Sequence, residues 1–169
     1  FVNEDFVPLS FGKNTQIEKE IIFAGYGLII DEDTLQWNDY KKIDASNKWV
    51  MILRGSPDGN NPHSNFYKHT SLRKKAIDAK DNNAVGVIFV SGKEFDAEDN
   101  LINLNYEQSQ QDIGIPVIHI KRNVADEIFK SKNLTIEELE KAINTNLNNF
   151  NSFKVDEKLN VQTDIKIIK

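Results

Sequence analysis

The chain has 169 residues, a formal net charge of −5 and a sequence pI near 5.3. This length fits one domain that can bury a core without metal or disulfide support. The acidic balance offers no broad positive field to hold nucleic acid, and no segment approaches the roughly 20 apolar residues of a membrane span. The sequence also has no cysteine, which excludes disulfides, thiol catalysis and thiolate metal sites.

The first part of the chain is predicted to contain an arm followed by a bent strand. The sequence opens at Phe1 without the regions of a signal peptide, so we expect a processed start or a segment of a longer protein. Residues 1–16 are polar and mixed and are predicted to form an N-terminal arm. A single domain is expected over residues 17–169. The β-rich stretch Ile17–Ile30 is interrupted by Gly25-Tyr26-Gly27, a pattern typical of a bulge or a sharp bend.

Two apolar runs separated by a helix predict a parallel pair of strands. Trp49–Leu53 is a continuous apolar run, and Ala84–Val90 is apolar on both faces. Between them lies a long loop, 55–70, rich in Gly and Pro at its start. Ser71 then caps a helix that is predicted to run to about Asn82. The order strand, helix, strand implies a crossover connection and parallel pairing.

The rest of the chain continues to alternate between strand and helix. A second long polar stretch, 91–114, precedes a predicted strand at Ile115–Ile120 and a helix at Arg122–Lys130. Thr135 opens a capping box and therefore a further helix. The apolar residues of that helix are spaced at i, i+4 and i+8: Leu139, Ile143 and Leu147. Alternation from Leu159 to Ile167 predicts a last strand with one exposed face.

Four blocks of sequence occur in an order and spacing that together are fairly specific. They are Phe23-Ala24-Gly25-Tyr26-Gly27; Trp37-Asn38-Asp39-Tyr40, followed by Asp44 and Lys48; a Lys- and Ala-rich helix leading into Ala84–Val90; and Ile115-Pro116-Val117-Ile118 with the helix after it. This pattern resembles the protease-associated (PA) domain that is inserted into zinc aminopeptidases of the M28 family. Val161-Gln162-Thr163-Asp164 is similar to the strand by which such domains return to the peptidase body. The resemblance covers residues 17 to 165.

Two departures from the family pattern replace glycine by asparagine. Asn47 stands where the family usually has Gly before the Lys that opens a strand, and Asn83 stands where it has Gly after the first helix. Asparagine is the residue that best replaces glycine in a left-handed backbone conformation. We therefore expect a left-handed conformation at both positions. The loop at 55–70 departs further from the family.

The resemblance implies an α/β fold, a swivelling β/β/α sandwich with mixed sheets and two or three flanking helices. It further implies a non-catalytic domain, with no cofactor in this chain, of a parent aminopeptidase that binds two zinc ions. The expected partners are the adjacent peptidase domain of the same polypeptide and a peptide substrate or protein partner. The expected role is interaction or control of substrate access. The family resemblance also places the protein outside the cytoplasm: secreted, periplasmic or on the outer surface of a bacterium.

The residues themselves offer little for catalysis. His63 and His69 lie six apart in or beside a loop, a spacing that fits neither a zincin helix nor a dinuclear site. His119 lies on a predicted strand, where we expect it to be hydrogen-bonded or to face the surface. The sequence has no Gly-x-Ser-x-Gly elbow, and the acidic segments 31–33 and 96–99 do not follow the EF-hand pattern. No catalytic or metal-binding residue is therefore assigned.

The two long loops are the predicted functional face. Trp37 and Tyr40 are expected to pack within the framework, whereas Phe66 and Tyr67 are candidates for exposed contacts. The full candidate interaction surface comprises residues of these two loops: Phe66, Tyr67, His69, Asn105 and Tyr106. Two other classes stay open. One is a stand-alone exported module that binds a peptide or a glycan, and the other is a small hydrolase with an unrecognised metal site.

Overall fold

A computed structural model describes residues 1–59, 61–103, 111–147 and 150–165. Its strands are β1 (Phe6–Pro8), β2 (Thr15–Phe23), β3 (Ile29–Glu32), β4 (Leu35–Asn38), β5 (Trp49–Leu53), β6 (Gly86–Val90), β7 (Val117–Ile120) and β8 (Phe153–Thr163). Its helices are α1 (Leu72–Asp81), α2 (Arg122–Phe129) and α3 (Ile136–Thr145), with short 3₁₀ turns η1 (Tyr67–His69) and η2 (Lys130–Lys132).

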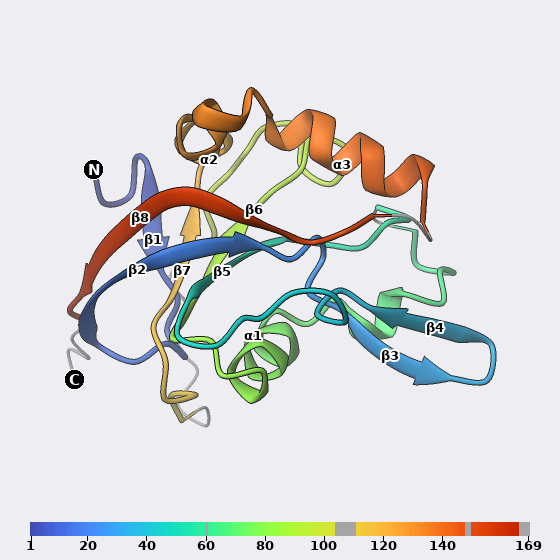
Figure 1. The fold of residues 1–169 in the computed structure, drawn as a ribbon, viewed down its shortest axis with the longest axis horizontal. Coiled ribbons are helices and arrows are strands. Elements are labelled where there is room, and N and C mark those ends of the chain that lie inside the picture. The colour runs from blue at the N-terminus through green and yellow to red at the C-terminus, as the bar shows by residue number, and fades with distance from the viewer. Residues whose placement is uncertain (60, 104–110, 148–149, 166–169) are drawn as a thin grey trace.

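Six strands form one mixed sheet, in the order β1-β7-β6-β5-β2-β8. The four inner strands are parallel to one another, and the edge strands β1 and β8 run antiparallel to β7 and β2. The hairpin β3–β4 forms a separate two-stranded sheet that projects from the body (Figure 1). The predicted parallel pair β5–β6, with α1 in the crossover, is confirmed.

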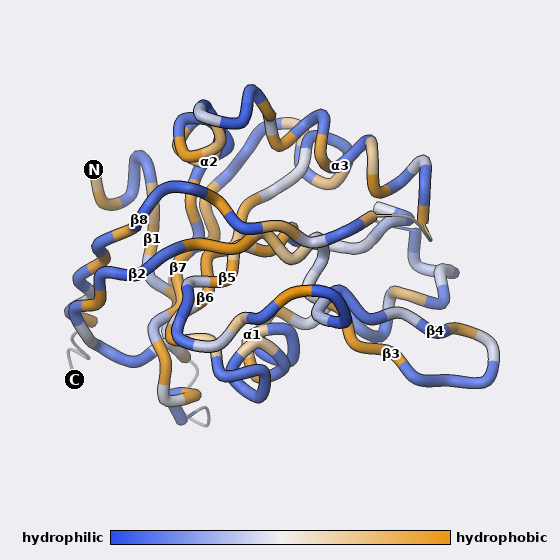
Figure 2. The backbone as a smooth tube through the Cα atoms, in the orientation of Figure 1, coloured by the Kyte–Doolittle hydropathy of each residue, from blue (hydrophilic) through white to orange (hydrophobic). Residues whose placement is uncertain are grey.

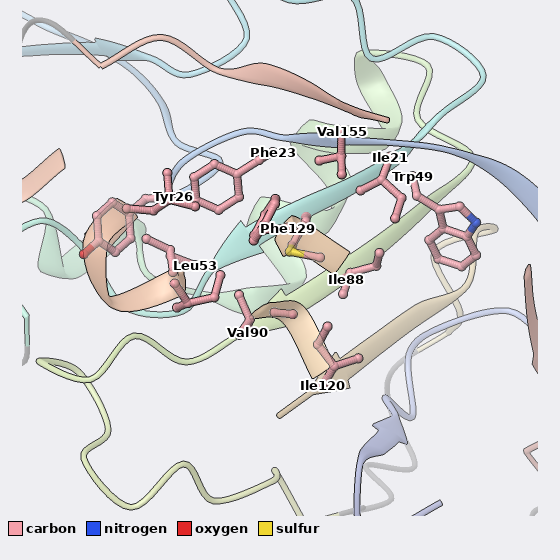
Figure 3. Close-up of a cluster of buried hydrophobic side chains, with 14 of the residues drawn as sticks. Ile21, Phe23, Tyr26, Trp49, Leu53, Ile88, Val90, Ile120, Phe129 and Val155 are labelled. Atoms are coloured by element: carbon pink, nitrogen blue, oxygen red, sulfur yellow. The ribbon is translucent and has the colours of Figure 1, made fainter. Parts of the chain in front are cut away.

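Helices cover both faces of this sheet, so its central strands are buried on both sides. In β5, Trp49, Met51 and Leu53 pack into a cluster that contains residues of α2 and α3, part of which Figure 3 shows. Val50 and Ile52 point to the other face, where the cluster contains residues of α1. Figure 2 shows apolar residues gathered along β5, β6 and β7. This arrangement confirms the predicted α/β fold with a mixed sheet and flanking helices.

Side-chain caps begin two of the helices where the sequence predicts them. The Ser71 hydroxyl accepts a hydrogen bond from the Lys74 backbone N–H at 3.4 Å. At α3, the Thr135 hydroxyl accepts from the Glu138 N–H at 3.3 Å, and the Thr135 N–H donates to the Glu138 carboxylate at 3.0 Å. A cap of this kind contributes about 1 kcal/mol. The predicted capping box is therefore confirmed.

Asparagines in left-handed conformation precede the two central strands. The φ angles of Asn47 and Asn83 are 60° and 64°, which confirms the expectation drawn from the missing glycines. The Asn47 N–H donates to the Asn83 carbonyl oxygen at 3.0 Å. The two turns thus contact each other where β5 and β6 begin.

A buried carboxylate joins two of the four sequence blocks. Gly25 and Gly27 have φ angles of 53° and 63°, so the predicted sharp bend is confirmed. Asp39 Oδ2 accepts the Leu28 N–H at 2.9 Å and thereby ties the bend to the residues that follow β4. Burial raises the pKa of Asp39 to about 6, and its hydrogen bond from Leu28 offsets part of this rise.

The first sixteen residues differ from the predicted arm. Residues 6–8 form β1, which pairs with β7, and Val7 and Leu9 are buried. In addition, β2 already begins at Thr15. A three-residue strand that contains Pro8 has almost no periodic signal, and its partner lies more than 100 residues away in the chain. Sequence alone therefore does not reveal this pairing.

The last strand begins earlier than the alternation predicts. β8 starts at Phe153 instead of Leu159 and pairs antiparallel along β2 as far as Thr163. The register shifts between Glu20 and Ile21 of β2, and such a bulge breaks the alternation of exposed and buried residues. The alternation extends back to Phe153 and is interrupted at Glu157, which is exposed.

Candidate interaction site

The two long loops leave the sheet side by side. β5 ends at Leu53 and β6 ends at Val90, and these two residues are paired in the parallel register. The Arg54 N–H donates to the Val90 carbonyl oxygen at 2.9 Å. In α/β sheets, ligands bind outside the carboxyl ends of the strands. The topology therefore places the first residues of both predicted loops at the carboxyl ends of β5 and β6, where a ligand is expected.

Phe66 is buried, which contradicts the expectation that it presents an exposed ring. Only 6% of its surface is accessible, and it packs edge-on against Trp37 with a centroid distance of 5.3 Å. This contact fixes the loop against the hairpin β3–β4. The residue is part of the framework, as Trp37 is, and it does not form a surface for a partner.

The other candidates in this loop lie nearer the surface. Tyr67 is 56% exposed, as predicted. His69 Nε2 lies 3.3 Å from Glu32 Oε1, and Lys68 Nζ donates to Glu32 Oε2 at 2.7 Å. The Lys68 hydrogen bond is the main reason why the pKa of Glu32 is lowered. His69 thus lies beside the hairpin carboxylate, which ties η1 to β3. Asn105 and Tyr106 lie outside the described residues.

A buried carboxylate holds the start of the second loop. Glu140 Oε2 accepts the Glu94 N–H at 2.9 Å, although Glu140 lies on the buried side of α3 with 1% exposure. Burial raises the pKa of Glu140, and hydrogen bonds from backbone N–H groups of this turn oppose the rise. Gly92 is required here because a Cβ atom would overlap the Glu140 carboxylate. The turn is therefore anchored to α3.

Arg122 anchors the following residues to α2. Its guanidinium donates to the carbonyl oxygens of Asp96 at 2.6 Å and Ala97 at 2.9 Å. Its backbone N–H donates to Asp99 Oδ2 at 2.9 Å. The acidic segment 96–99 is thus part of an internal hydrogen-bond network. Among the residues that the structure describes, no group of three or more His, Asp or Glu side chains is arranged to hold a metal ion.

A small pocket of about 150 Å³ opens between the two anchored loops. Its lining comes from the end of β5, both loops and the start of α1: Arg54, Gly55, Gly59, Tyr67, Thr70, Leu72 and Phe95. The Arg54 guanidinium lies 5.1 Å from the centroid of the Phe95 ring. Its Nη1 donates to Ser91 Oγ at 3.0 Å. Arg54 therefore contacts residues of both strand ends and the second loop.

A fully buried lysine supports the floor of this pocket. Lys75 Nζ donates to the carbonyl oxygens of Gly55 at 2.6 Å and Leu53 at 3.1 Å. Burial lowers the pKa of Lys75 to about 7; nearby Arg54 lowers it further and Asp39 opposes this. Sequence reasoning missed this residue, although its spacing from Leu72 and Ala79 places it in the apolar stripe of α1.

Ser91 and His119 lie close together but are not arranged for nucleophilic catalysis. Ser91 Oγ lies 3.3 Å from His119 Nε2, and both residues are fully buried. The Ile102 N–H donates to His119 Nδ1 at 3.2 Å, so the neutral ring carries its hydrogen on Nε2. Burial lowers the pKa of His119 to about 3. The ring therefore donates to Ser91 and does not act as its base, which agrees with the expected hydrogen-bonded histidine.

Comparison with known proteins identifies one family. The sequence model of the PA domain matches residues 18–128. A comparison with curated proteins finds no match. In the described part of the chain, no helix is long and apolar enough to cross a membrane.

Two solved structures of bacterial enzymes are similar to the chain. The aminopeptidase from Aneurinibacillus sp. strain AM-1 aligns with a TM-score of 0.50 and 15% identity, over 94% of this chain and 30% of the enzyme. BSAP, a zinc aminopeptidase from Bacillus subtilis, aligns with a TM-score of 0.49 and 20% identity, over 74% of this chain and 25% of the enzyme. The chain therefore spans less than a third of these enzymes, and the first similarity concerns the fold alone.

Proposed function

Because the chain belongs to the PA domain family, we propose that it is the non-catalytic module of a larger M28-type zinc aminopeptidase, where it contacts peptide or controls access to the active site. The observation that carries this proposal is the meeting of two anchored loops around a pocket at the carboxyl ends of β5 and β6. Binding sites commonly consist of loops on a rigid framework. The two zinc ions belong, in this proposal, to the peptidase domain of the same polypeptide.

The course of β8 supports a domain inserted into a host. β8 ends beside the beginning of β2, where Thr163 is paired with Thr15. Asn14 and Ile165 exchange two hydrogen bonds, at 2.9 Å and 2.7 Å. The region that matches the PA family begins at residue 18 within β2, although β1 precedes it at the opposite edge of the sheet. The chain thus leaves the sheet next to the start of that region, and closely spaced connections of this kind favour domain insertion. We propose that β8 is the return strand toward the peptidase domain, and that the protein acts outside the cytoplasm.

The test uses the full-length aminopeptidase. Tyr67→Ala removes the exposed aromatic side chain of the first loop without disturbing the buried contact between Phe66 and Trp37. Leu147→Ala, which truncates another exposed apolar side chain, is the matched control. We expect Tyr67→Ala to change kcat/KM for a long peptide while leaving hydrolysis of a small aminoacyl-nitroanilide unchanged. Equal kinetics of the variant and the control on both substrates would overturn the proposed role.

A second experiment separates this proposal from an independent hydrolase. The purified 169-residue chain is assayed for bound zinc and for hydrolysis of aminoacyl-nitroanilides. We expect neither a stoichiometric metal ion nor turnover. Turnover that depends on bound zinc would refute the non-catalytic role and would support the small-hydrolase alternative.

A further inference from the structure

The guanidinium of Arg54 has hydrogen-bonding capacity that the described residues do not use. Its Nη1 donates to Ser91 Oγ, whereas Asp96 Oδ2 lies 3.9 Å away, too far for a hydrogen bond. The buried Nε has no hydrogen-bond partner among the residues that the structure describes. Buried polar groups in folded proteins are nearly always paired. Arg54 lines the pocket, and its unpaired guanidinium nitrogen therefore favours an acceptor that the described residues do not supply.

The geometry of this side chain favours one class of acceptor. In arginine, the Nε–H and one Nη2–H point the same way and form a fork that matches the two oxygens of a carboxylate. Arg54 uses Nη1 for Ser91, and no described residue accepts a hydrogen bond from the Nε–Nη2 edge. The guanidinium lies over the Phe95 ring, and this contact limits its movement. A ligand carboxylate would therefore meet donors that are already oriented.

The size of the pocket agrees with this class of ligand. A volume of about 150 Å³ corresponds to roughly five waters at about 30 Å³ each, and therefore to one side chain or one chain end. Arg54 and the buried Lys75, which donates to the carbonyl oxygen of Gly55, supply positive charge. Asp96 is the neighbouring acid, and it already accepts the Asn100 N–H at 3.0 Å. Asp99 lies near Arg54 as well, and Asp39 lies near Lys75, so a bound carboxylate is favoured by the donors of Arg54 and not by an excess of positive charge.

We propose that the pocket between the loops is a carboxylate subsite, in which Arg54 binds a carboxylate of a peptide. This rests on the proposed function, since it names the chemical group that the interaction site recognises. The carboxylate comes either from an acidic side chain or from the C-terminus of the peptide. Tyr67 and Leu72 form walls for the atoms next to it.

The test is an NMR titration of the 169-residue chain that follows the Nε–Hε signal of Arg54. Four probes separate the possible ligands: acetyl-Ala-Ala-Ala with a free terminal carboxylate, acetyl-Ala-Ala-Glu-amide, acetyl-Ala-Ala-Gln-amide and inorganic phosphate. We expect the Arg54 signal to move saturably with one or both carboxylate peptides. The Gln peptide, which lacks a carboxylate, should leave it in place. Equal shifts with the Gln peptide, or a response to phosphate alone, would overturn the proposal.

Two arginine variants distinguish the carboxylate fork from mere charge. Arg54→Lys keeps the positive charge and loses the fork, so we expect at least about tenfold weaker binding, equivalent to about 1.4 kcal/mol. Arg73→Lys is the matched control, because Arg73 is likewise stacked on an aromatic ring, with 5.9 Å to the Phe11 centroid. Arg73 lines a different depression, where the negative charges of Asp81 and Asp112 balance the positive charges of Arg73 and Lys80. Unchanged binding by Arg54→Lys, or equal loss in both variants, would refute the subsite.

One further variant covers the case in which replacing Arg54 disturbs the second loop. Tyr67→Ala leaves every described contact of Arg54 in place and removes a wall of the pocket, so it should weaken binding of the carboxylate peptides. Unweakened binding by this variant would contradict the proposed pocket. The two proposals fail separately. A silent titration with altered kinetics of Tyr67→Ala in the full-length enzyme refutes the subsite alone, whereas a positive titration with unaltered kinetics refutes control of access alone.

Discussion

The left-handed asparagines Asn47 and Asn83 provide the sharpest test of how the sequence determines the backbone of the sheet. Asn47 and Asn83 are both exposed, and no hydrogen bond joins either side chain to another described residue. The substitutions Asn47→Ala and Asn83→Ala therefore change little except the preference of the backbone for a φ angle near +60°. The corresponding glycine variants restore that freedom and serve as controls at the same positions.

The expected magnitude follows from backbone sterics. A left-handed conformation costs an ordinary L-residue roughly 1–2 kcal/mol, and asparagine tolerates it better, so each alanine should destabilise the domain by about 1 kcal/mol. Each glycine variant should stay within about 0.5 kcal/mol of the wild type, because relief of strain is offset by greater freedom of the unfolded chain. The double alanine variant should lose about 2 kcal/mol, or roughly 4–8 °C in Tm for a domain of this size.

Urea unfolding followed by tryptophan fluorescence measures these differences, since Trp49 is fully buried and becomes exposed on unfolding. Asn160→Ala, at an exposed position of β8, controls for the general effect of losing an asparagine. Because the Asn47 N–H donates to the Asn83 carbonyl oxygen, the double variant also reveals any coupling between the turns. Alanine variants as stable as the glycine variants would refute the assigned backbone requirement.

Three other substitutions test the packing and the electrostatics of the frame. The pKa of Asp39 is raised from 3.8 to about 6. The free energy of unfolding of the wild type should therefore fall by up to about 3 kcal/mol as pH rises through this range, and it should not recover at higher pH. Asp39→Asn should flatten that profile in urea unfolding at pH 4 to 7, and parallel profiles of the two proteins would contradict the assignment. Phe66→Ala should lower the free energy of unfolding by about 3–5 kcal/mol, whereas Tyr67→Ala should change it by no more than about 0.5 kcal/mol. Similar losses in thermal unfolding would show that both rings lie in the same environment and would contradict this prediction. Gly27→Ala should cost about 1–3 kcal/mol more than Gly59→Ala, because both glycines have positive φ but only a Cβ on Gly27 would press on Ile52; equal Tm values would disprove that close contact.

The features that the sequence predicts correctly are local ones. The Ser71 cap, the capping box at Thr135 and the turns at Asn47 and Asn83 each depend on residues within about four positions. The apolar runs of β5 and β6 are equally local, because strands covered on both faces are apolar throughout. The order of these signals predicts the parallel pair β5–β6, whereas the prediction of the whole fold came from the family resemblance.

The features that were missed depend on contacts between distant segments. Phe66 and Tyr67 are adjacent and equally aromatic, and only the position of the hairpin that carries Trp37 decides which of them is buried. Ser91 and His119 meet because β6 and β7 are in one particular register. Predicting that the strands are parallel does not determine this register.

The positions of two buried charges are indicated by the sequence. Lys75 and Glu140 both lie within the apolar stripe of their helix, where a charged residue is unexpected. Each proves to bind backbone groups at the start of a loop: Lys75 the carbonyls after β5, and Glu140 an N–H after β6. A charged residue in an apolar stripe therefore indicates where a loop is anchored.

The anchoring of both loops determines how a ligand in the pocket would act on the rest of the domain. Arg54 follows β5, stacks on Phe95 of the second loop and donates to Ser91, which in turn contacts His119 of β7. A carboxylate bound by Arg54 would thus interact with a side chain that is already connected to three strands and one loop. Buried hydrogen bonds hold the first residues of both loops. Binding at this place therefore costs little conformational entropy for ordering those residues. The selectivity of the site should therefore depend on the exposed side chains around it, such as Tyr67, which is 56% exposed.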